Sequence, residues 1–272
     1  MNPLWLSQIR AVLGLELRKS LFSARAIPVY FVALVPVGLM ALFAVVAAIT
    51  GPDDLPSIGE APGFFAVVYQ SILRGFLFIG CVWTFMNLFR GEVIDRSLHY
   101  YFLAPIRREV LVAGKFVSGL ASTVILFVGS TVLSMFLFYS IFGLSVAAEQ
   151  LLSGPGFAQL TGYIGVTFMA CLGYGAVFLV VGLFFRNPII PAVLIWVWEW
   201  INPFLPALLK KISVIFYLDS LLPVDLPQGV FAVVAEPVTA WLAVPGFILF
   251  TALTLLAASL RIRHMEISYA AD

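Results

Sequence analysis

The chain has 272 residues, of which 62% are hydrophobic and only 11% are charged. A soluble domain carries roughly a quarter charged residues, so this composition excludes the soluble globular class and favours a membrane protein. The net charge of +1 says little as a total, because the placement of charge carries the information in such proteins. The two cysteines, Cys81 and Cys171, lie in apolar stretches and predict buried core residues, without a disulfide framework or a metal cluster.

The N-terminal segment, residues 1–28, predicts a helix that lies in the membrane interface. Its apolar residues recur at helical spacing: Trp5, Ile9, Val12, Leu13 and Leu17. Arg10, Gly14 and Arg18 occupy the opposite face, as expected for an interfacial amphipathic helix. Glu16 projects near the apolar face, which suggests that this face contacts protein as well as lipid.

Six runs with few or no charges follow, and each is long enough to cross ~30 Å of hydrocarbon at ~1.5 Å per residue. They are Val29–Thr50, Phe64–Phe89, Phe116–Phe142, Tyr163–Phe185, Ile189–Leu209 and Ala240–Leu260. Arg186 and Pro188 separate the fourth run from the fifth, because proline suits the first turn of a new helix. The sequence therefore predicts an all-α, polytopic membrane protein with one transmembrane domain over residues 1–272 and six transmembrane helices.

Basic residues identify the cytoplasmic side of this arrangement. Successive spans run in opposite directions, so the N-terminal segment, every second connection and the C-terminal tail lie on the same side. These four segments contain most of the basic residues: Arg10, Arg18, Lys19 and Arg25; Arg90, Arg96, Arg107, Arg108 and Lys115; Arg186; Arg261 and Arg263. The first two loops of the other side contain acids and no base: Asp53, Asp54, Glu60 and Glu149. Only Lys210 and Lys211 depart from the pattern, so both termini are expected in the cytoplasm.

The charged loop between the second and third runs, residues 90–115, is the most informative segment. Ile94, Leu98, Tyr101 and Phe102 share one face of a short helix, and Pro105 ends it. A compact amphipathic helix held between two spans suits contact with a soluble partner. The alternative is a basic loop that only fixes topology.

Residues 202–237 contain five prolines and are too broken to span the membrane. Short helices that re-enter the membrane or lie on its outer face are expected there. Two charges interrupt the apolar runs, Arg74 in the second and Glu199 in the fifth. Their depths nearly coincide, which predicts an ion pair. The alternative has Arg74 extending to the outer headgroups and Glu199 neutral among tryptophans.

The order Gly91-Glu92, Ser97-Leu98, Ala104-Pro105-Ile106-Arg107-Arg108 and Gly114-Lys115 resembles the corresponding loop of type-2 ABC exporter permeases. The resemblance extends to the N-terminal (elbow) helix, the six spans and the broken segment before the last span. It implies that the loop forms a coupling helix on a separate ATPase. The coupling residues would be Glu92, Ile94, Arg96, Leu98, Tyr101, Pro105, Arg107, Arg108 and Lys115.

The resemblance further implies a homodimer, or a pair of like permeases, above two ATPase subunits in a prokaryotic inner membrane. ATP and Mg would be bound by the partner, with no cofactor on this chain. The chain itself lacks a P-loop, since its only Gly-Lys pair, Gly114-Lys115, is followed by Phe116 instead of serine or threonine.

Three other functions compete with an ATP-driven exporter. A subunit of the same family could transmit movement to an outer-face partner without passing substrate. A secondary transporter is disfavoured because the second half has no counterpart of the Glu92–Lys115 pattern. An intramembrane enzyme is disfavoured because His99 and His264 show no metal-ligand spacing.

Overall fold

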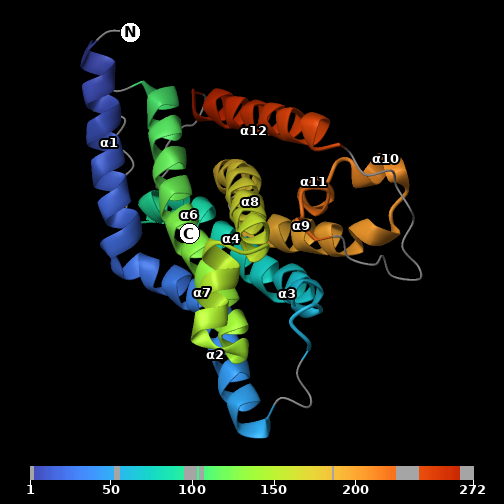
Figure 1. The fold of residues 1–272 in the computed structure, drawn as a ribbon. Coiled ribbons are helices and arrows are strands. Elements are labelled where there is room, and N and C mark those ends of the chain that lie inside the picture. The colour runs from blue at the N-terminus through green and yellow to red at the C-terminus, as the bar shows by residue number, and fades with distance from the viewer. Residues whose placement is uncertain are drawn as a thin grey trace.

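The computed structural model describes residues 3–51, 56–94, 103, 107–185, 187–224 and 239–263, and all regular structure within them is helical (Figure 1). The first half contains α1 (Pro3–Phe22), η1 (Ala24–Ala26), α2 (Ile27–Thr50), α3 (Ala61–Val68), η3 (Tyr69–Leu73) and α4 (Arg74–Ile94). The second half contains α6 (Arg108–Tyr139), η4 (Ser140–Phe142), α7 (Leu144–Leu152), α8 (Gly156–Phe184), α9 (Ile189–Ile201), η5 (Asn202–Phe204), α10 (Ala207–Lys210), α11 (Val214–Asp219) and α12 (Ala240–Arg263). The all-helical prediction is confirmed for these residues.

Within the described residues, five helical segments are long and apolar enough to cross a membrane: Ile27–Thr50, Ala61–Glu92, Arg108–Phe142, Gly156–Phe184 and Trp241–Arg263. They match the first four predicted spans and the sixth, except that Phe185 and Ala240 fall just outside. The fifth predicted span, Ile189–Leu209, is not one helix, because α9 has only 13 residues. Leu205 is extended before Pro206, a proline that cannot continue the helix. The prediction of one continuous span over these residues was therefore too long.

Helix α8 lies at the centre of the bundle and packs against α4, α6 and α12 (Figure 1). Two of its glycines permit close contact: a Cβ at Gly173 would lie 2.2 Å from the Phe247 ring, and one at Gly175 would lie 2.5 Å from the Phe85 ring. Such small residues let membrane helices approach closely where no hydrophobic effect drives association. The glycines of α8 therefore help to fix α4 and α12 on it.

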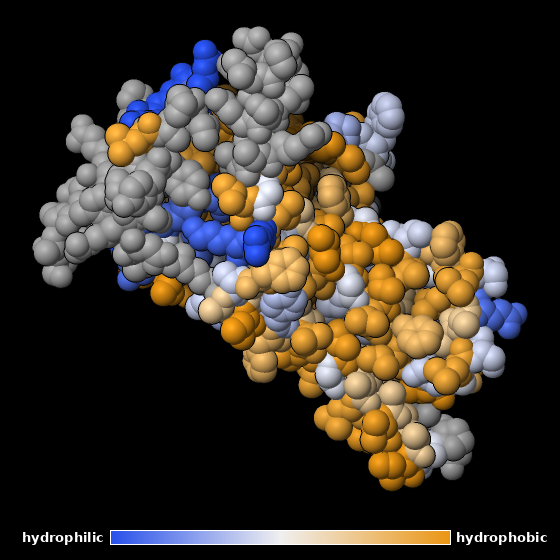
Figure 2. All heavy atoms as spheres, turned by 90° about the vertical axis from the view of Figure 1, so that its left-hand side faces the viewer, coloured by the Kyte–Doolittle hydropathy of each residue, from blue (hydrophilic) through white to orange (hydrophobic). Residues whose placement is uncertain are grey.

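Helices α2 and α12 lie at the periphery and expose apolar side chains. Leu42 is 60% exposed on α2, and Trp241 is 84% exposed on α12. Figure 2 shows a broadly hydrophobic surface, with hydrophilic residues gathered mainly toward one end. An apolar surface of this extent requires lipid or a protein partner.

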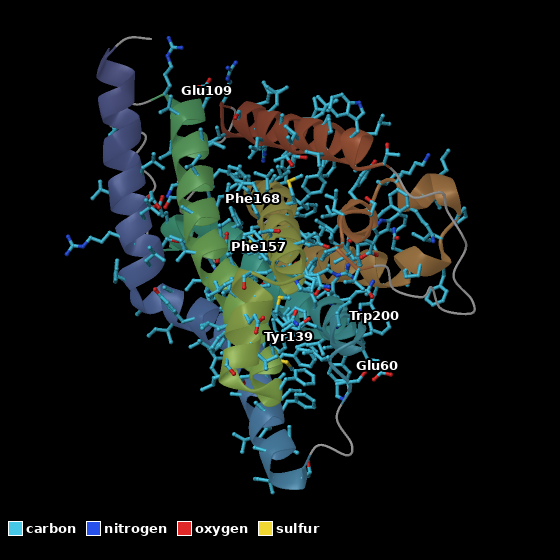
Figure 3. The ribbon with its side chains drawn as sticks, in the orientation of Figure 1. Glu60, Glu109, Tyr139, Phe157, Phe168 and Trp200 are labelled. Atoms are coloured by element: carbon cyan, nitrogen blue, oxygen red, sulfur yellow. The ribbon has the colours of Figure 1, made fainter. Side chains whose placement is uncertain are left out.

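The segments that carry the basic residues meet at one end of the bundle. Helix α1 lies along α6, the last turn of α4 contacts the start of α6, and the last turn of α12 contacts the same start. We call this region the charged end. Figure 3 shows Glu109 there and Glu60 far from it, at the opposite end.

Candidate functional site

The predicted coupling loop is described only at its two ends. Helix α4 ends at Ile94 and α6 begins at Arg108, with Arg107 as an extended N-cap. Arg96, Leu98, Tyr101 and Pro105 lie outside the described residues, as does most of the helix predicted over Glu92–Phe102. The structure does place Glu92, Arg107, Arg108 and Lys115, so the anchoring of the loop is defined.

A buried ionic cluster joins three helices at the charged end. Lys115 of α6 is fully buried, and its Nζ lies 2.9 Å from Glu16 Oε1 of α1 and 2.8 Å from Glu92 Oε1 of α4. Lys19 Nζ of α1 lies 2.9 Å from the same Glu92 oxygen. We call Glu16, Lys19, Glu92 and Lys115 the ionic cluster. Two acids and two bases balance one another, as burial of charge requires.

Local sequence brings these side chains together. Gly119 lies one turn after Lys115, and a Cβ there would lie 3.0 Å from the side chains of Leu88 and Phe85 on α4. Lys115 Nζ also lies 5.4 Å from the centre of the Phe89 ring, within the range of a cation–π contact. The expectation that the Glu16 face of the N-terminal helix contacts protein is confirmed, since Glu16 is 3% exposed.

The start of α6 is fastened separately to the end of α12. Arg108 Nη1 donates to the carbonyl oxygens of Ile262 and Arg263, at 3.2 and 3.0 Å. These carbonyls belong to the last turn of α12, where a cation satisfies unpaired acceptors and complements the helix dipole. Arg263 Nε lies 2.6 Å from Glu109 Oε1 in return. Both ends of the loop are therefore tied to spans other than their own.

A second polar cluster lies toward the opposite end and corrects one prediction. Arg74 forms an ion pair with Asp219 at the end of α11, and the predicted pairing of Arg74 with Glu199 is wrong. Gln70 Nε2 also donates to Asp219 Oδ1, at 3.4 Å. Gln70 belongs to the π-helical turn η3, which directly precedes Arg74. Such turns are rare and are frequent at functional sites.

Glu199 fastens α11 to α9 instead. Its carboxylate accepts hydrogen bonds from the backbone N–H groups of Val214 and Ile215, at 3.1 and 2.8 Å. The Tyr174 hydroxyl donates to it from α8, at 3.2 Å. Glu199 is 6% exposed, so these donors replace water around a buried carboxylate.

Asp219 is the residue that sequence reasoning missed. It lies in the proline-rich segment where neither helical periodicity nor charge pattern predicts what a side chain contacts. The one available signal was its position in a largely apolar stretch, which marks an acid as a partner for a buried base.

The described residues contain no group of three or more His, Cys, Asp or Glu side chains arranged to hold a metal ion. At the loop outside the membrane segments, Glu60 accepts hydrogen bonds from Ser57 N and Ser57 Oγ, at 3.0 and 2.8 Å. The backbone hydrogen bond from Ser57 lowers the pKa of the exposed Glu60 carboxyl below its usual value.

These features define a polytopic helical membrane protein whose charged end presents a loop anchored on both sides. Residues 10–188 match the family described as ABC-2 family transporter protein, and the match covers well over half of the chain. The chain belongs to this family of membrane transporter subunits. Searches of curated proteins and of solved structures find no match. The family match includes the ionic cluster and ends before α9, α11 and Asp219.

Proposed function

We propose that the chain is the permease subunit of an ATP-driven exporter in a prokaryotic cytoplasmic membrane. Two copies would form the translocation path, and two separate ATPase subunits would bind ATP and Mg beneath them. Membership in the ABC-2 family supports the transporter role, and the basic residues of the charged end support a cytoplasmic position for it. Both termini would then be cytoplasmic.

We infer a sixth crossing from the positions of the helix ends. Helix α8 ends at the charged end, where Arg261 of α12 lies 5.3 Å from the ring of Phe184. Helix α12 also ends there, so a spanning α12 begins on the opposite side. The chain between them would then cross once, and we assign this crossing to α9 with the short helices α10 and α11. Such broken helices are tolerated where protein surrounds them.

The anchoring of the 90–115 loop is the observation that carries the proposal. Glu92 at one end of the loop is fixed to α1 and α6 by Lys19 and Lys115. Arg108 at the other end is fixed to α12. A push on the loop by an ATPase would therefore move four helices together instead of bending one exposed segment.

The substitution Leu98→Asp tests the proposal, because it puts a charge on the predicted apolar face that seats on the ATPase. The complex would be purified with its ATPase and compared with wild type for stoichiometry and for ATP hydrolysis in lipid discs. We expect equal numbers of the two subunits in wild type. In the variant we expect loss of the permease-dependent part of hydrolysis, while the ATPase alone keeps its basal rate.

Glu60→Gln is the matched control, since Glu60 lies on a loop at the opposite end and is exposed. It should leave both association and hydrolysis unchanged. Pro105→Ala should weaken coupling in the same direction as Leu98→Asp by loosening the predicted end of the helix. Wild-type assembly and hydrolysis in the Leu98→Asp complex would contradict the proposal and favour a basic loop that only fixes membrane topology.

A further inference from the structure

The second spanning segment, Ala61–Glu92, is not one uniform helix. Between α3 and α4 it contains the π-helical turn η3, Tyr69–Leu73. The hydrogen bonds of a π-helical turn enclose one residue more than those of an α-helical turn, so η3 changes the orientation of α3 relative to α4. One residue of an α-helix corresponds to a rotation of roughly 100°, which is therefore the change that conversion of η3 to an α-helical turn would produce.

A chain of buried hydroxyl groups holds the first residue of this turn. The Tyr69 hydroxyl lies 2.9 Å from Thr167 Oγ1 of α8, which lies 3.3 Å from Thr131 Oγ1 of α6. Thr131 donates its own proton to the carbonyl oxygen of Phe127, at 2.8 Å. Because each hydroxyl has only one proton to donate, Thr167 donates to Thr131 and Tyr69 donates to Thr167. All three hydroxyl residues are buried, so water does not compete for these bonds.

The rest of the turn is held by a different element. Gln70 within the turn and Arg74, the first residue of α4, both contact Asp219 of α11. Tyr69 therefore fastens the start of the turn to α8, and Asp219 fastens its continuation to α11. A rotation of α3 relative to α4 would separate at least one of these contacts. The π-helical form is the one in which both are made.

Helix α3 does not itself require one orientation. Its eight residues, APGFFAVV, contain no polar side chain. Ala66 and Val68 are buried, whereas Val67 between them is 52% exposed. A rotation by one residue in either sense would put Val67 where Ala66 or Val68 now lies, and would exchange one apolar side chain for another. Neither orientation of α3 requires burial of a polar group, whose cost would oppose the rotation.

We propose that η3 is a conformational switch with a π-helical and an α-helical form, and that its contact with Asp219 selects the π-helical form. When Asp219 leaves Arg74, the turn becomes α-helical and α3 rotates by about one residue on α4. The hydrogen bond from Tyr69 to Thr167 breaks in the same step, while α4 keeps its contact with α8. The switch belongs to this chain alone and does not depend on the proposed ATPase partner.

The test uses the purified chain in lipid discs, without an ATPase. A small trifluoroethyl group on Val67→Cys reports exposure of α3 to lipid, through the effect of dissolved oxygen on its ¹⁹F relaxation. The matched control is Ile79→Cys on α4, which is 48% exposed, and both native cysteines are buried. Asp219→Asn should lower the oxygen effect at position 67 several-fold and leave it unchanged at position 79. Tyr69→Phe, which removes the other contact of the turn, should lower it at position 67 as well.

Deletion of Ser71, an exposed residue of η3, gives a second and opposite test. It removes the extra residue of the turn while α3 and α4 keep their present orientations. The group at position 67 should then stay exposed even when the deletion is combined with Asp219→Asn. Unchanged exposure at position 67 in both Asp219→Asn and Tyr69→Phe would overturn the proposal. Equal changes at positions 67 and 79 would overturn it in favour of a general disturbance of the bundle.

Discussion

The two polar clusters of this protein differ in burial and in what they connect. In the ionic cluster, Lys115 is fully buried and Glu92 almost so, and the cluster joins three long helices. In the cluster at the opposite end, Arg74 is buried but the Asp219 side chain is 36% exposed, and Asp219 belongs to a helix of six residues. We therefore describe the ionic cluster as a joint between three helices, whereas in the second contact water reaches the Asp219 side chain.

This difference is consistent with the proposed function, in which movement received at the charged end opens the opposite end. A joint that transmits force must keep its geometry under load, which buried and mutually neutralised charges provide. A contact that opens must lose less free energy than such a joint when it breaks, and the 36% exposure of the Asp219 side chain reduces that loss because water can reach it. Substitutions in the ionic cluster should therefore have the largest effects, and substitutions in the more exposed contacts should have smaller ones.

Lys115→Met should have the largest effect. It leaves the carboxylates of Glu16 and Glu92 buried with much less positive charge, and loss of one partner in a buried pair typically costs about 3–5 kcal/mol. We expect a strongly lowered melting temperature of the purified chain in detergent. The combined change Lys115→Met, Glu16→Gln and Glu92→Gln should recover much of the stability, because the one charge that remains, on Lys19, is 40% exposed and can reach solvent. A melting temperature of Lys115→Met equal to wild type would refute the description of the cluster.

Asp219→Asn should have an intermediate effect. It removes the counter-charge of Arg74, and a hydrogen bond to a charged group contributes about 1.5–3 kcal/mol. The cost should be below that of Lys115→Met, because solvent reaches the Asp219 side chain. In a double-mutant cycle of melting temperatures, Arg74 should couple to Asp219 and not to Glu199. Coupling of Arg74 to Glu199 alone would reverse the assignment.

Glu109→Gln should have a small effect. The side chains of Glu109 and Arg263 are 34% and 55% exposed, and exposed ion pairs contribute about 0.2–1 kcal/mol. The loss should shrink further in 0.5 M salt, about three times the physiological ionic strength. A loss as large as that of Lys115→Met would show that the start of α6 is held by this pair instead of by the cluster.

Glu60→Gln should have the smallest effect, and only above the pH at which Glu60 ionises. The hydrogen bonds from Ser57 lower the pKa of Glu60, so any stabilisation is present above the ordinary carboxyl pKa and is lost as the pH falls through the lowered value. Melting curves of wild type and variant should differ slightly at pH 7 and coincide at low pH. A difference that grows on acidification would contradict this sign.

Five of the six predicted spans and the charged end could be predicted because they depend on composition along the chain. The length of an apolar run predicts the length of a spanning helix, and basic residues identify the helix ends that lie on the same side of the membrane. The position of Lys115 and Arg108 at one end of the bundle could therefore be predicted from the sequence. The contact of Glu16 with protein was also indicated by its position on an apolar face. These signals are local and need no knowledge of neighbouring helices.

The partner of Arg74 could not be predicted in this way. Depth in the membrane put Glu199 at a similar level, but depth does not specify which face of a helix points at which neighbour. Pro206 interrupts the helical stretch that begins with α9, and the chain then turns back toward α9. The backbone N–H groups of Val214 and Ile215 therefore donate hydrogen bonds to the Glu199 carboxylate. Asp219 then comes to Arg74 through that same return. The pairing of Arg74 with Asp219 therefore depends on tertiary geometry, which sequence periodicity does not report.

The central claim is that the ionic cluster transmits movement from the coupling loop to the opposite end. It is tested most directly by spin labels at Ile58→Cys in the two copies of the proposed dimer, since this residue is 45% exposed at the opposite end and both native cysteines are buried. The distance between labels would be measured with and without trapped ATP in the assembled complex. We expect an ATP-dependent change in the otherwise native chain. We expect none when Lys115→Met, Glu16→Gln and Glu92→Gln are combined, although the ATPase still binds and hydrolyses ATP. The same distance change in both complexes would contradict the account.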